Sequence, residues 1–264
     1  MGKAIAIYNP ILNSVGSTTT SISLSGIFSW YALKKTLILD LTESADLEKH
    51  INISTKYTLD FLRSYDEKLD CEVIQMHSTS LNHKLDIIGG YTLDKSIIGD
   101  VKNFEILLIE EAKKKYDYVI VDLSNTYKDY ILEKADYILP ILPFDAIQLD
   151  RLEKREFKGK EICIFSRIAE ELEEEIQGIA LQYKIDNYVW LPLDADIQYY
   201  SGISKNLYKY IEENINSRNT YMDQVKEINY EILKRDFPDA YEENTYSWKD
   251  IFRMGGKHNG KRAR

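Results

Sequence analysis

Three side chains with oxygen atoms suited to binding a metal ion follow predicted elements of the chain: Thr18, Asp40 and Asp122. Hydroxyl and carboxylate oxygens are ligands that Mg²⁺ prefers, and a Mg²⁺–nucleotide is commonly held by such a set. Each residue could also have a simpler structural role, because Ser and Thr cap helix starts and a strand-end Asp caps the next turn. Their occurrence together, in this order, is more specific than any one of them.

The elements around Thr18 predict an anion site. Residues 4–8 form an apolar run typical of a buried strand, which stops at Asn9. Residues 11–20 form a loop rich in small polar side chains, and residues 21–32 show helical spacing of apolar residues. Backbone N–H groups converge on an anion where a strand, a loop of small residues and a helix start follow one another. We therefore expect a phosphate to bind at this loop.

The rest of the chain alternates between the two element types. Strands are predicted at residues 36–42, 71–76, 84–88, 116–124, 137–142, 162–165 and 188–191. Helices are predicted at residues 47–66, 103–115, 145–156, 168–183 and 207–234. This alternation favours an α/β fold with a doubly wound, mostly parallel sheet and helices on both faces. Ligands of such folds bind beyond the carboxyl ends of the strands, where Thr18, Asp40 and Asp122 fall.

Composition restricts the remaining choices. The 264 residues suit one α/β domain, residues 1–235, with a C-terminal extension, residues 236–264. The two cysteines, Cys71 and Cys163, predict no disulfide framework, and four scattered histidines argue against a metal cluster. We find neither a signal peptide nor an apolar run of about 18 residues, so the expected location is cytoplasmic. The net charge of −9 argues against direct nucleic-acid binding.

The motifs together resemble the ParA/MinD family of partitioning and positioning ATPases over about residues 1–214. Residues 13–19 align with the phosphate loop, 36–40 with the second strand, 85–90 with a later strand, 116–122 with the Mg²⁺-associated acidic strand and 191–194 with a turn near the adenine. The resemblance implies a P-loop NTPase-like fold that binds ATP or ADP with Mg²⁺.

The resemblance also implies roles for individual residues. Phosphate contacts would come from Asn13, Ser14, Val15, Gly16, Ser17, Thr18 and Thr19. Contacts near the base would come from Ser166, Arg167 and Pro192. Thr18 and Asp122 would be the Mg²⁺ ligands, and Asp40 and Asp122 the catalytic carboxylates of an active enzyme.

Departures from the family pattern fall on the charged positions. Leu12 or Asn13 occupies the position of the signature lysine, and Ser17 that of the phosphate-loop lysine. Asn13 and Ser14 replace loop glycines, Thr42 replaces a second acidic residue and Ser166 a base-reading asparagine. A charge-assisted hydrogen bond contributes about 1.5–3 kcal/mol, so losing both lysines weakens triphosphate binding by about 10²-fold or more. We expect a degenerate site that keeps the fold and has lost turnover or slowed it greatly.

The C-terminal segment carries a second motif. Trp248, Ile251 and Phe252 share one helical face, with Lys249 and Arg253 beside them. This resembles the membrane-targeting end of MinD-type proteins and predicts an anionic membrane surface as a partner. The alternative is a helix packed on its own domain, followed by a basic tail.

The sequence therefore predicts a positioning or scaffold protein on a ParA/MinD-like domain. It would form a homodimer across the nucleotide-site face and recruit a protein partner, at the inner face of the membrane or in a secretion or pilus assembly, as TadZ-type relatives do. The alternative is a slow, authentic ATPase that takes its cation from elsewhere, such as Lys3 or a residue of the partner subunit. A metabolic enzyme of the same superfold is disfavoured because it needs the phosphate-loop lysine.

Overall fold

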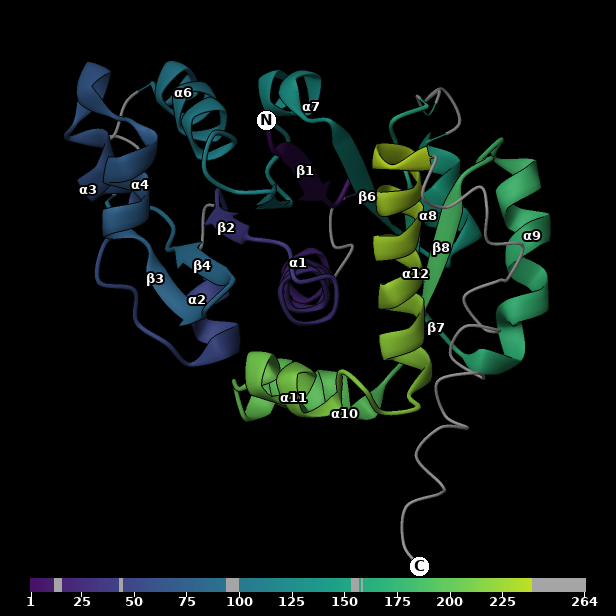
Figure 1. Ribbon diagram of the computed structural model, residues 1–264. Coiled ribbons are helices and arrows are strands. Elements are labelled where there is room, and N and C mark those ends of the chain that lie inside the picture. Colours follow the sequence, from purple (N-terminus) through teal and green to yellow (C-terminus); the bar gives the residue numbers. More distant parts are fainter. Residues whose placement is uncertain (12–15, 43–44, 94–99, 153–156, 158, 239–264) are drawn as a thin grey trace, which may run out of the picture.

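Eight strands form one sheet between two layers of helices in the computed structural model (Figure 1), which describes residues 1–11, 16–42, 45–93, 100–152, 157 and 159–238. The strand order is β3-β4-β2-β5-β1-β6-β7-β8. The strands are β1 (Lys3–Tyr8), β2 (Thr36–Asp40), β3 (Thr79–Asn82), β4 (Leu85–Ile88), β5 (Tyr118–Ser124), β6 (Tyr137–Pro143), β7 (Cys163–Ile168) and β8 (Tyr188–Pro192). Every neighbouring pair is parallel except β3 and β4.

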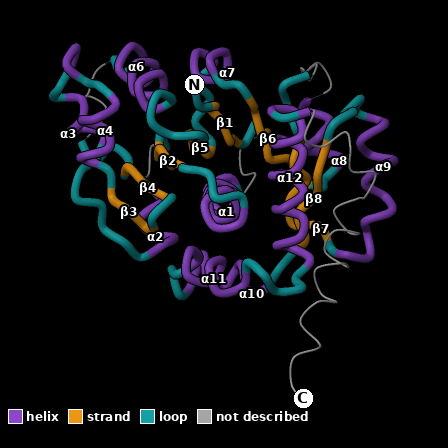
Figure 2. The backbone as a smooth tube through the Cα atoms, in the orientation of Figure 1, coloured by secondary structure: helices purple, strands orange, loops and turns teal. Residues whose placement is uncertain are grey.

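Helices cover both faces of the sheet, as Figures 1 and 2 show. One face packs against α1 (Ser17–Gly26), which continues as the π-helical turn Ile27–Tyr31, and against α2 (Asp46–Ile51), α10 (Ala195–Gln198), α11 (Leu207–Asn214) and α12 (Thr220–Asp236). The other packs against α3 (Leu59–Arg63), α4 (Cys71–His77), α6 (Lys102–Ala112), α7 (Asp129–Lys134), α8 (Ala146–Leu149) and α9 (Glu173–Gln182). The predicted doubly wound α/β architecture is confirmed.

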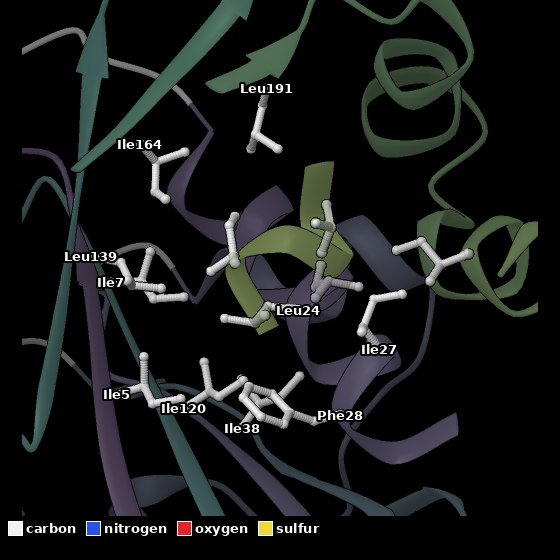
Figure 3. Close-up of a cluster of buried hydrophobic side chains, with 14 of the residues drawn as sticks. Ile5, Ile7, Leu24, Ile27, Phe28, Ile38, Ile120, Leu139, Ile164 and Leu191 are labelled. Atoms are coloured by element: carbon white, nitrogen blue, oxygen red, sulfur yellow. The ribbon is translucent and has the colours of Figure 1, made fainter. Parts of the chain in front are cut away.

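The alternating faces of β1 explain its unbroken apolar sequence. Successive side chains of a strand point to opposite faces, and helices bury both faces here. Ile5 and Ile7 join the core beneath α1, whereas Ala4, Ala6 and Tyr8 join the core on the far side. Figure 3 shows Ile5 and Ile7 close to other buried side chains of the core beneath α1. The central strand is thereby fixed on both sides, and with it the position of the loop that leads into α1.

Several predicted elements differ from the structure. Residues 71–76 form helix α4 instead of a strand, because the Asp70 side chain accepts hydrogen bonds from the Glu72 and Val73 amides and caps the helix. The helix expected over residues 47–66 is two short helices, α2 and α3, and the one over residues 207–234 divides into α11 and α12. Strand β3 was not predicted. Helix α1 begins at Ser17, four residues before the predicted start.

No helix in the described part of the chain combines the length and the apolar character that crossing a bilayer requires.

The close packing of α1 on α11 yields a stability prediction. A Cβ atom on Gly26 would lie 2.8 Å from Cγ2 of the buried Ile211, whereas one on Gly178 in α9 would meet nothing within 4 Å. Both substitutions to alanine gain helix propensity, but crowding a packed core costs about 1–3 kcal/mol. We expect Gly26→Ala to lower the free energy of unfolding, measured by urea denaturation, and Gly178→Ala to raise it by about 0.5–1 kcal/mol. Equal stabilisation by both would contradict this packing.

Candidate functional site

The amino end of α1 lies just beyond the carboxyl end of β1. Gly16 precedes the helix with φ of 121°, a conformation that favours glycine, and its carbonyl accepts the first helical hydrogen bond from the Thr20 amide at 2.8 Å. Among the described residues, no side chain caps this end of the helix. Ser17, Thr18 and Thr19 therefore stand in the first helical turn, where uncapped N–H groups attract anions. Of the predicted phosphate loop, Asn13, Ser14 and Val15 lie outside the described residues.

Asp40 and Asp122 lie side by side at the ends of adjacent strands. They are register partners in the β2–β5 pair, and both are fully buried. The Asp40 oxygens are engaged: Oδ1 accepts from the Thr42 amide at 3.0 Å and from its hydroxyl at 2.5 Å, and Oδ2 accepts from the Leu47 amide at 3.1 Å. Asp40 thus holds the connection between β2 and α2, the simpler role considered for a strand-end Asp.

Asp122 is less completely paired. Its Oδ1 accepts a hydrogen bond from the Ser124 amide at 3.2 Å, while its buried Oδ2 has no hydrogen-bond partner among the described residues. Burial raises the pKa of Asp122 to about 8, and the Asp40 carboxylate adds to the rise while the Thr18 hydroxyl opposes it. A buried carboxylate with an unpaired oxygen next to a hydroxyl is suited to a cation, whose charge would offset the cost of ionisation.

Ser17, at the position that aligns with the phosphate-loop lysine, takes part in a buried hydrogen-bond network. It is buried, and its Oγ accepts a hydrogen bond from Asn9 Nδ2 at 3.3 Å. The same Asn9 nitrogen donates to Asn125 Oδ1 at 3.1 Å, so the ends of β1 and β5 are joined to the start of α1. Asn9 Oδ1 is buried and lacks a hydrogen-bond partner in the described structure. A polar network therefore lies where the family places a cation.

A cleft of about 490 Å³ opens above these groups. The structure brings Gly16, Ser17, Thr18, Thr19 and Arg167 together around it. The other lining residues are Asn9, Asp46, His50, Ser124, Asn125, Gln198, Ser201 and Gly202. Its volume lies within the range of small-molecule sites.

Lys3 is too far away to supply the missing charge. It starts β1, at the end of the strand opposite the cleft, and its Nζ lies 3.5 Å from the Asp136 carboxylate. A six-residue strand extends roughly 17–20 Å. The interpretation of Lys3 as a substitute cation is therefore wrong in this structure.

A smaller hollow of about 40 Å³ adjoins the cleft. Ser166, Arg167 and Pro192, the residues expected near a base, line it together with Gly16 and Thr19. The hollow is much smaller than the cleft. The structure brings Ser166, Arg167 and Pro192 together around this hollow, and their contact with a base stays a prediction.

Sequence reasoning missed several residues of the cleft. Asn9 carried a usable signal, because it follows the first strand directly and strand ends are where ligands bind. His50 and Ser201 carried none: His50 Nδ1 lies 2.9 Å from the Ser201 carbonyl oxygen, and this contact joins segments far apart in the chain. Such contacts exist only once the helices have packed.

Neither protein-family models nor the sequences of curated proteins give a match to this chain. Solved structures do. A ParA family ATPase from Chlorobium tepidum TLS gives a TM-score of 0.71 at 15% identity, over 87% of this chain and 99% of that one. The septum site-determining protein MinD from Pyrococcus horikoshii OT3, complexed with Mg-ADP, gives 0.66 at 15% identity over 93% and 100%. MinD in the MinC:MinD complex of Aquifex aeolicus gives 0.65 at 14% identity over 88% and 96%. The chain has the ParA/MinD fold.

The pKa of Asp122 leads to a prediction about stability and pH. Its folded value of about 8 lies above the unfolded value of about 3.9, so the folded chain binds the proton more tightly and wild-type stability falls as the pH rises between them. Asp122→Asn removes this fall in stability, because asparagine does not ionise. We expect the stability of Asp122→Asn relative to wild type to increase between pH 5 and pH 8 by more than about 1 kcal/mol, in urea denaturation without Mg²⁺.

Asp186→Asn, at an exposed position, is the control for the loss of one carboxylate. A difference between Asp122→Asn and wild type that stays constant over this pH range would contradict the prediction.

Proposed function

We propose that this protein is a ParA/MinD-like positioning or scaffold protein with a degenerate nucleotide site, which recruits a partner complex. One observation carries the proposal. The amino end of α1, the Thr18 hydroxyl and Asp122 lie together at the edge of the sheet where the parallel strands end, called the carboxyl edge below. At this edge Ser17 stands at the position where the lysine is expected. The edge retains groups that bind Mg²⁺ and phosphate and lacks the charge that drives phosphoryl transfer. Weak binding of ATP or ADP without rapid turnover follows.

The residues present fit a magnesium ion. Thr18 offers a hydroxyl and Asp122 an unpaired carboxylate oxygen, both hard oxygen ligands. Bound Mg²⁺ would neutralise charge on the phosphates, and Asp122 would be ionised to hold it. The uncapped N–H groups after Gly16 would receive phosphate oxygens. The MinD structure from Pyrococcus horikoshii, complexed with Mg-ADP, supports this ligand class.

Exposed apolar side chains at the same edge support a homodimer across the nucleotide-site face. Large exposed apolar residues follow the carboxyl ends of β4, β5, β6 and β8; they are Leu93, Tyr127, Ile147, Leu193 and Ile203. Other exposed apolar residues, such as Leu33 and Phe237, lie elsewhere, so the proposal rests on the group that follows the strand ends, since exposed apolar patches form interaction surfaces. The MinC:MinD complex, which has this fold, supports the proposal that a different protein also binds this chain.

Attachment to an anionic membrane through Trp248, Ile251 and Phe252 is part of the proposal, with a location at the inner face of the membrane. These residues lie outside the described part of the chain. The alternative function is a slow ATPase in partitioning, polar localisation or pilus assembly, with Asp40 and Asp122 as its catalytic carboxylates.

Restoring the lysine tests the degenerate site. Ser17→Lys returns a cation to the first turn of α1, and a charge-assisted hydrogen bond to phosphate is worth about tenfold or more in affinity. We expect Ser17→Lys to bind Mg²⁺–ATP at least about tenfold more tightly than wild type in isothermal titration. Ser17→Met, similar in length and uncharged, is the matched control and should show no gain. Phosphate release by wild type should not exceed that of Asp122→Ala; rapid release abolished by Asp122→Ala would establish the ATPase instead.

A charge on the proposed dimer face should prevent self-association. The Ile147 side chain is 76% exposed after β6, and that of Leu181 is 80% exposed on α9, away from the carboxyl edge. We expect Ile147→Glu to shift the Mg²⁺–ATP-loaded chain from dimer to monomer in sedimentation velocity, because burying an unpaired carboxylate is costly. Leu181→Glu should leave the dimer intact. A wild-type chain that stays monomeric with ligand would contradict the proposed dimer.

A further inference from the structure

The cleft contains little positive charge. Among its described lining residues, Arg167 is the only lysine or arginine. Asp46 lines the cleft, and the fully buried Asp122 does not line it but lies next to the hydroxyl of Thr18, which does. A phosphate chain at the amino end of α1 carries several negative charges, so a cation beside it would strengthen its binding. Mg²⁺ can supply only part of this positive charge, because its place is beside Asp122.

The backbone of Arg167 adopts a conformation that packing alone does not favour. Its φ is 62°, in the left-handed region, at an irregularity in the pairing of β7 with β8 between Ser166 and Ile168. Glycine adopts this region freely, whereas a long side chain is strained there. Arg167 therefore occupies a strained backbone position beside the cleft.

The Arg167 side chain is exposed, and no hydrogen bond or ion pair joins its guanidinium to another residue of the described structure. An arginine engaged in holding the fold would have a carboxylate or carbonyl partner, as Lys113 has in Asp136 at 2.9 Å. The guanidinium presents a planar fork of donors that matches phosphate oxygens. Arg167 is therefore available to a ligand in the cleft that it shares with Thr18 and Thr19.

We propose that Arg167 binds the phosphates of the ligand and replaces the cation that the loop lacks at Ser17. This inference rests on the proposed function, since it assumes that the carboxyl edge binds a phosphate chain. It gives Arg167 a role different from the contact near the base that the resemblance implied. The position of Arg167 supports this choice, because Arg167 lines the larger cleft together with Ser17, Thr18 and Thr19.

Isothermal titration of the full chain with three probes tests the inference: Mg²⁺–ATP, Mg²⁺–tripolyphosphate and adenosine. We expect Arg167→Ala to weaken the binding of ATP and tripolyphosphate by about tenfold or more, with no effect on adenosine. Arg167→Lys should recover part of the loss, because it keeps the charge without the fork. A loss confined to adenosine would show that Arg167 contacts the nucleoside, and would overturn the inference.

A pair of glycine variants separates binding from folding. Lys184 is also an exposed cation in the left-handed region, with φ of 55°, and lies outside the cleft. Glycine at either position relieves the same strain, so both variants should melt a few degrees higher than wild type. Only Arg167→Gly should weaken phosphate binding. If wild type and Arg167→Gly bind tripolyphosphate equally, the inference fails and the proposed site stands; if wild type binds neither phosphate probe, both fail.

Discussion

The buried carboxylate of Asp122 is the constraint on which the carboxyl edge of the sheet depends. Its strand, β5, lies between β1 and β2, so the carboxylate is held in the middle of the sheet, where water does not reach it. A buried ionised group is costly unless charge or hydrogen bonds compensate it. Asp40 beside it makes ionisation harder still. The Ser124 amide and the Thr18 hydroxyl offset only part of this cost, since Oδ2 has no hydrogen-bond partner among the described residues.

The neighbouring groups can be understood from this constraint. Asp40 is tied to Thr42 and Leu47, which leaves Asp122 as the carboxylate of the pair with an oxygen to offer. The uncapped amino end of α1 supplies partial positive charge at the same place. An Mg²⁺–phosphate ligand would bring a cation to the carboxylate and anions to the helix in one step. Binding and the ionisation of Asp122 are therefore linked, and affinity rises with pH until the carboxylate is ionised.

The sequence predicted the central strands well because both faces of the sheet are buried. A short segment that is apolar at nearly every position, such as β1 or β5, is typical of a strand covered on both sides. Short elements were predicted poorly. Helix α4 buries only Ile74, so its sequence lacks a helical apolar face, and the capping by Asp70 decided its structure. The start of α1 was misplaced because Ser17, Thr18 and Thr20 are buried although polar, which hydrophobic spacing cannot reveal.

The site was predicted in part for a similar reason. Groups at strand ends, such as Thr18, Asp40 and Asp122, follow from the topology of a doubly wound sheet. The different roles of Asp40 and Asp122 do not follow from the topology, because they depend on which backbone amides lie within hydrogen-bond distance of each carboxylate. The contact of His50 with Ser201 likewise depends on how α2 packs against the segment after α10.

The absence of a loop lysine changes what the edge can do, even where the ligand still binds. A lysine within the phosphate loop stabilises the charge that develops on the phosphates during transfer. It can do so because it belongs to the loop whose backbone N–H groups hold those phosphates. Arg167 stands on β7, across the cleft from α1, so its contact depends on how closely the two walls approach. Under the proposed function, Arg167 would contact the phosphates only when the walls of the cleft approach each other, so ligand binding would be linked to the arrangement of β7 and α1.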